Sequence, residues 1–196
     1  SDLESGVTLT ITGLLTIRGK VTIKGGGTIL RGTNSAYFSV ISGADLTIGD
    51  VMLEGNSLSS NYSLIEVNRS KLTLDNGCHI QNCIKSNSGA ILIVGGGAIW
   101  TNTGSIVLNN VIIENCSANS EGGAICVQEG SSVTINGGIY RNNKTTSITS
   151  PRNGWGGGFM YNIGTLSIYG GSFIENPSVG RGGCIYHGGV SGTKTY

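Results

Sequence analysis

Proline, charge and long apolar runs are scarce in this sequence of 196 residues, and each scarcity excludes a class of protein. Only two prolines occur, and the 34 glycines follow no three-residue period, so the chain is not collagen. Charged residues make up 12% of the chain, about half the usual share, while 38% of the residues are hydrophobic. This combination disfavours intrinsic disorder and predicts a folded protein.

The sequence indicates neither a nucleic-acid partner, nor membrane insertion, nor a cofactor. The net charge is +1, and Lys and Arg are scattered along the chain, so no basic surface is expected. No apolar run approaches the ~20 residues that a spanning helix needs. The five cysteines form no Cys-x-x-Cys pair, and the two histidines lie apart from any cysteine pair. We therefore expect no metal site and no disulfide framework.

The chain repeats one pattern with edits. A closing motif recurs at intervals in the mid-twenties of residues, two of them lengthened, and ends at Gly32, Gly55, Asn82, Asn115, Asn142 and Asn176. Before each closing motif, two aliphatic residues flank a residue that is usually Thr, at 21–23, 46–48, 72–74, 106–108, 133–135 and 166–168. This alternation predicts strands, and the Gly, Asn and Ser between them predict turns. No stretch has the apolar period of a helix.

Short strands at this spacing favour an all-β solenoid in which each repeat forms one coil. Identical positions of successive coils then stack ~4.8 Å apart and bury each other's aliphatic side chains. An antiparallel sandwich is disfavoured, because hairpin turns of the Asn-Gly type do not recur at regular spacing. We expect residues 1–196 to form a single domain of about six to seven coils.

Two motifs carry a resemblance to known repeats. The Gly-Gly-Ala-Ile stretches 96–99 and 122–125 and the Phe-Ile-Glu-Asn stretch 173–176 resemble the GGAI and FxxN repeats of chlamydial polymorphic outer-membrane proteins. The wider rhythm is similar to parallel β-helix repeats in surface proteins of Gram-positive bacteria, best over residues 38–186. The resemblance implies a right-handed, single-stranded, pectate-lyase-like parallel β-helix on the bacterial cell surface or cell wall. Stretches 88–89 and 157–159 are imperfect copies.

Both ends of the sequence look incomplete as solenoid ends. The opening residues form irregular first coils, and the last coil, which begins at Gly182, has no closing motif. Because solenoids need capped ends, we expect the native protein to continue beyond Tyr196.

The acidic residues give little support for catalysis. Glycoside hydrolysis needs two carboxylates within ~5–10 Å of each other, and a lyase needs clustered acids for Ca²⁺ with a basic residue. Asp45 and Asp50 flank one predicted strand, and Asp75 lies one coil further on, near turns where Asp is common. We predict no catalytic residues, although the β-helix fold is shared with polysaccharide-cleaving enzymes.

Aromatic residues suggest a binding surface. Aligning the strands that follow each Gly-Gly places Trp100, Tyr161 and Tyr186 in one column with Glu66 and Cys126. A Glu in this column implies that it faces outward, where the aromatic rings would stack on a sugar or anchor a protein. The alternative is that a side loop covers the column.

Two long connections bear on this surface. Residues 82–96 and 142–157 form longer links than 115–122 and should leave the same corner, one coil apart. The second link carries Arg152 and Trp155. Long loops on a rigid scaffold often carry function, so we predict Trp100, Tyr161, Tyr186, Arg152 and Trp155 as ligand-binding residues.

Two further columns have structural interpretations. The residues before each closing position should form one exposed column in which Glu114 alternates in charge with its neighbours; its members are Arg31, Glu54, Gln81, Glu114, Arg141 and Glu175. Exposed ion pairs of this kind contribute only ~0–1 kcal/mol each. Cys83 and Cys116 fall on adjacent coils at a distance that a disulfide could span. We favour reduced, buried thiols, with Cys78 also filling the core.

Taken together, the sequence predicts a monomeric, adhesin-like surface module without catalytic activity, a stalk or a binder of a host or microbial glycan or surface protein. The first alternative is a polysaccharide lyase or glycoside hydrolase of the β-helix fold. The second is a structural spacer that binds no ligand.

Overall fold

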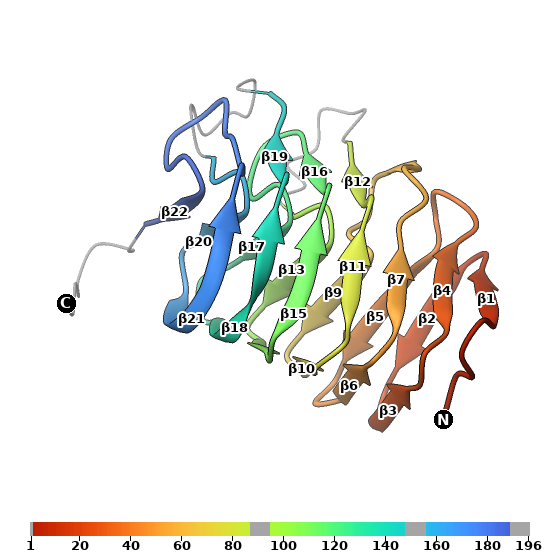
Figure 1. The fold of residues 1–196 in the computed structure, drawn as a ribbon. Coiled ribbons are helices and arrows are strands. Elements are labelled where there is room, and N and C mark those ends of the chain that lie inside the picture. The colour runs from red at the N-terminus through yellow and green to blue at the C-terminus, as the bar shows by residue number, and fades with distance from the viewer. Residues whose placement is uncertain (1, 87–94, 148–155, 189–196) are drawn as a thin grey trace.

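The computed structural model describes residues 2–86, 95–147 and 156–188, and every regular element in these residues is a β-strand. All strand pairs are parallel. The strands form three curled sheets that surround one apolar core (Figure 1). Stacked parallel strands of this kind are consistent with the β-solenoid class that the repeats predicted.

The first sheet has 11 strands in the order β1-β4-β7-β11-β15-β18-β14-β10-β6-β3, with β21 beside β18. Its strands are β1 (Thr8–Ile11), β3 (Lys20–Lys24), β4 (Thr28–Arg31), β6 (Asp45–Gly49), β7 (Met52–Glu54), β10 (Lys71–Leu74), β11 (His79–Gln81), β14 (Ser105–Leu108), β15 (Val111–Glu114), β18 (Ser132–Arg141) and β21 (Thr165–Ile174).

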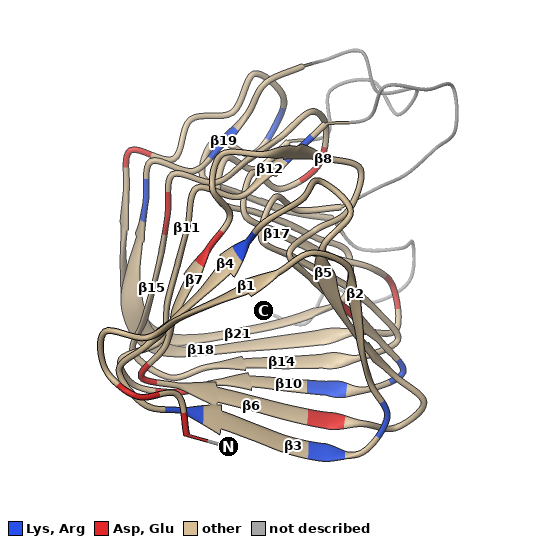
Figure 2. Ribbon diagram, turned by 90° about the vertical axis from the view of Figure 1, so that its right-hand side faces the viewer, with Lys and Arg blue, Asp and Glu red and all other residues tan. Residues whose placement is uncertain are grey.

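This sheet has two halves on adjoining sides of the molecule, which the ten-residue strands β18 and β21 join (Figure 2). The start of β18 pairs with β14 and its end pairs with β15. Between the two halves lie Gly137 and Gly138, with φ of 136° and 115°. Glycine is favoured there because side chains disfavour this backbone conformation.

The other two sheets complete each repeat. The seven-stranded sheet contains, in spatial order, β2 (Leu14–Ile17), β5 (Tyr37–Ile41), β9 (Ile65–Asn68), β13 (Ile99–Asn102), β17 (Ile125–Val127), β20 (Met160–Asn162) and β22 (Ile185–His187). The four-stranded sheet contains, in spatial order, β19 (Lys144–Thr145), β16 (Ser117–Ala118), β12 (Ile84–Lys85) and β8 (Ser59–Ser60).

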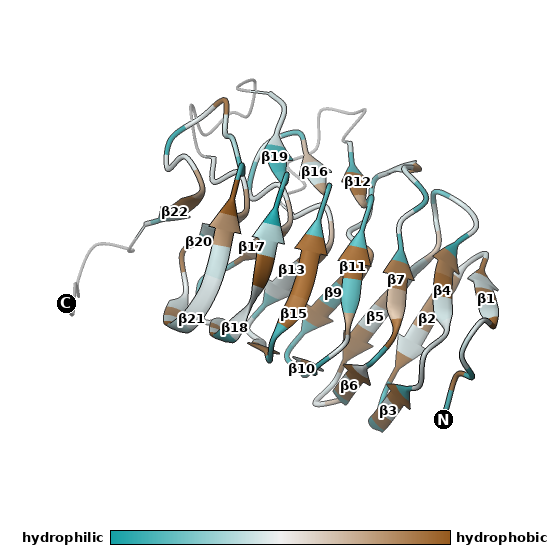
Figure 3. Ribbon diagram, in the orientation of Figure 1, coloured by the Kyte–Doolittle hydropathy of each residue, from teal (hydrophilic) through white to brown (hydrophobic). Residues whose placement is uncertain are grey.

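Equivalent residues of successive repeats are paired in register. We call each repeat, as one layer of this stack, a rung. The six aliphatic-polar-aliphatic stretches lie in β3, β6, β10, β14, β18 and β21, as the sequence predicted. Their middle residues form one column of Thr22, Thr47, Thr73, Val107, Thr134 and Ser167. The flanking aliphatic residues form the two neighbouring columns, which alternate with it across the sheet. Figure 3 shows the resulting alternation of hydropathy along the strands.

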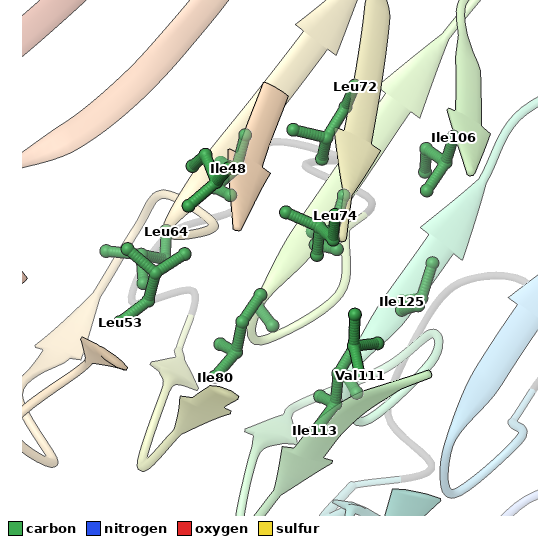
Figure 4. Packing of buried hydrophobic residues seen from close by; sticks show 14 of the residues in the cluster. Ile48, Leu53, Leu64, Leu72, Leu74, Ile80, Ile106, Val111, Ile113 and Ile125 are labelled. Carbon is green, nitrogen blue, oxygen red and sulfur yellow. The ribbon is translucent and has the colours of Figure 1, made fainter. Parts of the chain in front are cut away.

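The core consists of these inward columns from the facing sheets. Ile48 and Leu74 of the first sheet, Ile125 of the seven-stranded sheet and Ile113 of β15 are fully buried and belong to one cluster (Figure 4). Burying a Leu or Ile side chain stabilises the fold by about 1.5–3 kcal/mol. Cys78 is buried in the same cluster, as predicted.

The recurring Gly-Gly pairs stand where two backbones almost touch. A Cβ atom on Gly97 would lie 2.6 Å from the carbonyl oxygens of Cys83, Ser117 and Gly123. A Cβ atom on Gly123 would lie 2.1 Å from the oxygen of Gly158. The chain that enters the seven-stranded sheet therefore passes directly against the chain near the four-stranded sheet, and only glycine leaves room for this approach.

Candidate functional site

The predicted aromatic column exists, but it is not an open stripe. Trp100 pairs with Glu66 and Cys126, and Cys126 pairs with Tyr161, which pairs with Tyr186. Cys126 and Tyr161 are fully buried, yet neither belongs to the core cluster. They therefore lie on the outer side of the seven-stranded sheet, beneath other parts of the protein.

The exposure of the three aromatic residues differs along the column. Trp100 and Tyr186 are half-buried, whereas Tyr161 is buried. The rings of Tyr161 and Tyr186 stack at a centroid distance of 5.0 Å and an interplanar angle of 7°. The expectation of a partly exposed stripe was thus wrong at Tyr161. The other predicted ligand-binding residues, Arg152 and Trp155, lie outside the described residues, so binding at this surface stays a prediction.

Two buried charged side chains, Lys85 and Glu121, lie near the column member Glu66, and the sequence analysis did not identify either of them. Lys85 is 3% exposed, Glu121 is fully buried and Glu66 is half-buried. Burial lowers the pKa of Lys85, and the nearby carboxylate of Glu66 acts against this shift. Burial likewise raises the pKa of Glu66, against the effect of Lys85. The Nζ atom of Lys85 lies 3.5 Å from the Oγ atom of Ser63. Lys85 therefore forms a buried charge network with the carboxylates of Glu66 and Glu121. Such opposite charges offset part of the cost of burying one another.

The long connections leave the four-stranded sheet. The first follows β12 and the second follows β19, and β16 pairs with both of these strands. One rung, that of β16, therefore lies between the two connections. The Gly-Gly pairs of all three rungs are linked, since the Gly97 N–H donates to the Gly123 oxygen and the Gly123 N–H to the Gly157 oxygen.

The charged column is confirmed in its pairing at the centre and is wrong at its ends, and of the four central members only Arg141 is exposed, whereas Glu114 is buried. Glu54, Gln81, Glu114 and Arg141 are paired in register. Leu30 pairs with Glu54 and Ile174 pairs with Arg141, so the two predicted end members are displaced by one residue. The physical reason is the two-residue period of a strand, in which a slip of one reverses the side of every side chain.

The first misplaced residue, Arg31, is fully buried instead of exposed. Its Nε atom donates to the Ala36 oxygen at 2.9 Å, and its Nη2 atom lies 3.4 Å from the Tyr62 oxygen. Burial lowers the pKa of Arg31. The guanidinium thus ties two turns together at the inner corner of its rung.

Glu114, a buried carboxylate, is the centre of an ion cluster. Its Oε1 atom lies 2.8 Å from the Nε2 atom of His79, and its Oε2 atom lies 2.5 Å from the Nε atom of Arg141. Partial burial acts to raise the pKa of Glu114, but the hydrogen bonds from Arg141 and His79 outweigh it, and the pKa is lowered. The cluster joins three rungs and is a structural use of the carboxylate.

The corner after this column turns in the left-handed conformation. Asn82, Asn115 and Asn142 each have φ of 55°, and Glu175 has φ of 49°. Asn is one of the few side chains that tolerates this conformation. The last rung is therefore aligned on Glu175 and not on Asn176, which corrects the closing position predicted there.

One residue further on, the side chains turn inward and form a buried amide ladder. The Asn143 Oδ1 atom accepts from the Cys116 N–H at 3.1 Å, and its Nδ2 atom donates to the Ile113 oxygen at 3.0 Å and to the Asn176 Oδ1 atom at 2.9 Å. Asn176 continues the ladder by donating to the Tyr140 oxygen at 2.7 Å. Asn143 is fully buried. The ladder fixes the corner because each amide hydrogen-bonds a backbone N–H and a backbone oxygen of the preceding rung.

The preceding rungs carry thiols at this same inner position. Cys83 and Cys116 are buried and free, as the sequence favoured. Each thiol is placed to donate to the carbonyl oxygen two residues earlier, at 3.4 Å for Cys83 and 3.3 Å for Cys116. These cysteines act as small core residues with weak hydrogen bonds.

The aspartates lie at two places: Asp45 begins β6, whereas Asp50 and Asp75 lie on adjacent rungs beyond the other end of β6. Asp45 and Asp50 lie at opposite ends of β6, and Asp50 occupies a left-handed turn position with φ of 50°. The Oδ1 atom of Asp75 accepts a hydrogen bond of 2.7 Å from the Asn109 side chain. Among the described residues, no group of three or more His, Cys, Asp or Glu side chains could hold a metal ion.

A groove runs across the corner between the left-handed turns and the four-stranded sheet. One wall is the turn residues of successive rungs and the other is the outward side of β12, β16 and β19. Its lining residues are Ile84, Asn115, Ser117, Asn142, Lys144, Thr146, Glu175 and Pro177. From the sequence, Asn115 and Asn142 were identified only as closing positions of the repeat, and only the stacking of the rungs brings the lining residues together. A second, shallower depression lies over the turns that precede β6, β10 and β14.

In the part of the chain that the structure describes, no helix is both long and apolar enough to traverse a lipid bilayer. No family model matches the chain, and no curated protein or solved structure is detectably similar to it.

Proposed function

We propose that this chain is a non-catalytic binding module of an extracellular bacterial surface protein. Its scaffold is a right-handed parallel β-helix of about six to seven coils, and its partner is a host or microbial glycan or surface protein, bound by a monomer. The repeat motifs support the surface location through their resemblance to surface-protein repeats. The rigid stack of parallel strands suits a module that holds a ligand site away from the cell.

One contrast between side chains supports binding over catalysis. The carboxylates of Glu54, Asp75 and Glu114 are engaged in hydrogen bonds from neighbouring rungs. By comparison, Asn115, Asn142 and other polar groups that line the corner groove remain exposed. Carboxylates that already accept hydrogen bonds from neighbouring rungs are poorly placed for acid-base chemistry. Exposed side-chain amides, by contrast, can hydrogen-bond a ligand.

Binding is tested with the whole chain on a glycan array and in pull-downs from host-surface and bacterial-surface extracts. We expect specific capture of a glycan or glycoprotein. The predicted aromatic site is tested by changing Trp100→Ala and Trp155→Ala together, with far-ultraviolet circular dichroism to check folding. A folded double variant that binds as well as the wild type would remove these two residues from the site.

The enzymatic alternative has its own assay. Incubation with pectin-like and host polysaccharides should give no new reducing ends and no unsaturated products. Turnover that is abolished by Asp50→Ala or Asp75→Ala would instead establish a carbohydrate-active enzyme. Absence of any binding and of any turnover would leave the chain as a structural spacer.

A further inference from the structure

The corner groove has the geometry of a ligand site that repeats from rung to rung. Glu114 pairs with Arg141, and Ser117 pairs with Lys144, so Asn115 and Asn142, which lie between these pairs, face each other on adjacent rungs. Their spacing is that of neighbouring strands, ~4.8 Å. Glu175 extends the same wall by one rung, because the N–H of Asn142 donates to the oxygen of Ile174. The groove therefore presents an ordered row of polar side chains.

The polar groups of this row are open. Asn115, Asn142, Lys144 and Glu175 are exposed, and within the described parts of the chain no hydrogen bond or ion pair engages their side chains. Elsewhere on the surface, comparable amides pair with each other: Asn136 donates to Asn109 at 2.8 Å, and Asn110 donates to Asn76 at 3.1 Å. The left-handed backbone fixes the direction in which the side chains of Asn115 and Asn142 point. This fixed direction lowers the entropy cost of binding.

The chemistry of the groove matches a neutral, hydroxyl-rich ligand. Each amide offers two N–H donors and an acceptor oxygen. A sugar hydroxyl group is itself a donor and an acceptor, so the two groups can hydrogen-bond in either direction. One ammonium group, on Lys144, and one carboxylate, on Glu175, leave the groove without net charge, so it selects neither anions nor cations. Ile84 and Pro177 supply small apolar surfaces for the C–H faces of a sugar ring.

An extended peptide fits this groove less well. Peptides that add to a sheet need an open strand edge with unpaired backbone groups. In the four-stranded sheet, β12 pairs with β8 and β16, and β16 pairs with β12 and β19. On the far side of β19, Thr145 forms a parallel bridge with Ser178. The backbone along the groove is therefore already paired, and only side chains are available to a ligand.

We infer that the corner groove binds a neutral oligosaccharide, with the amides of Asn115 and Asn142 hydrogen-bonding successive hydroxyl groups and Lys144 closing the opposite wall. This inference rests on the proposed binding function and assigns it a site and a ligand class. It places the site on the described scaffold, and it does not require the covered aromatic column.

The test uses variants that remove the amides without straining the turn. Asn115→Gly and Asn142→Gly together keep the left-handed conformation, because glycine adopts it without a steric cost. The matched control is Asn110→Gly, a left-handed, exposed Asn with φ of 51° on a different corner. The wild type is screened on an array of neutral and acidic oligosaccharides, and the best neutral glycan is titrated calorimetrically. We expect the double variant to weaken binding by about tenfold or more, since each amide contributes ordinary hydrogen bonds, and the control to leave binding unchanged.

The outcomes separate this inference from the proposed function. If the wild type binds a neutral glycan and the double variant binds it equally well, the groove is not the site, although the binding function stands. Binding restricted to acidic glycans or to a peptide also overturns the inference. If the wild type binds nothing, the proposed function itself fails. Selective loss in Lys144→Ala, with full retention in Asn110→Gly, would add a second residue in support.

Discussion

Removing the buried amide of Asn143 should destabilise the protein far more than removing an exposed one. In Asn143→Ala, the Cys116 N–H loses its acceptor, the Ile113 oxygen loses its donor, and the Asn176 Oδ1 atom loses one of its two donors. Because Asn143 is fully buried, water cannot replace these bonds. The ladder at this corner would be interrupted between two rungs.

The magnitude follows from the number of bonds. Three side-chain hydrogen bonds are lost, and each contributes about 0.5–1.5 kcal/mol net, so the free energy of unfolding should fall by about 3 kcal/mol. The unsatisfied backbone groups place the value towards the upper end of the range for single substitutions. The matched control is Asn136→Ala, an exposed residue with one side-chain hydrogen bond, at 2.8 Å to Asn109, for which we expect a loss below about 1 kcal/mol.

Urea unfolding of the wild type and both variants, followed by circular dichroism, gives the comparison. The midpoint for Asn143→Ala should fall well below that for Asn136→Ala, with similar slopes for all three proteins. Equal midpoints for the two variants would refute the view that the ladder stabilises the corner. A changed slope for Asn143→Ala alone would instead indicate that the rungs no longer unfold together.

Three further predictions follow from the same geometry. Gly97→Ala should prevent stable folding, since its Cβ atom would lie 2.6 Å from three carbonyl oxygens, whereas Gly19→Ala, with nothing within 4 Å, should leave the melting temperature nearly unchanged. The hydrogen bonds from Arg141 and His79 lower the pKa of Glu114 in the folded state. Their stabilisation is therefore complete above about pH 4.3 and is lost as the pH falls through the folded pKa. Glu114→Gln should reduce the melting temperature at pH 6 and have little effect at a pH below the folded pKa. Burial raises the pKa of Cys78 to about 12. A maleimide at pH 8 should therefore label half-buried Cys184 first and reach Cys78 only after unfolding, which peptide mass spectrometry would show. Rapid labelling of Cys78 in the native protein would contradict its burial.

The strands of the first sheet were predictable because their signal is local. Val133 and Ile135 flank Thr134 in the alternating pattern that any half-buried strand needs, and the same pattern recurs in each repeat. Once one repeat was aligned, the register of its neighbours followed, and Trp100, Cys126 and Tyr161 indeed pair in one column. Repetition thus supplied the long-range information that a single sequence usually lacks.

The errors arose where a slip of one residue decides the side of a strand. The motif ending at Asn176 looks like the one ending at Asn142, yet the left-handed turn falls at Glu175, and Asn176 stacks on Asn143. Arg31 was assigned to the exposed column because it precedes the closing position Gly32, but Leu30 occupies that column and Arg31 points into the corner. Composition and motif similarity cannot resolve a shift of one position, since both alignments preserve the pattern of residue types.

By itself, the sequence determined that this protein is built from stacked parallel strands, because alternation and turn residues act over a few neighbouring positions and are repeated along the chain. The tertiary structure alone decided which side chains are open to a ligand. Tyr161 is covered and Glu66 lies next to a buried lysine, whereas Asn115 and Asn142 stand exposed on adjacent rungs. Exposure depends on contacts between residues that are tens of positions apart, and these exist only after the rungs have stacked.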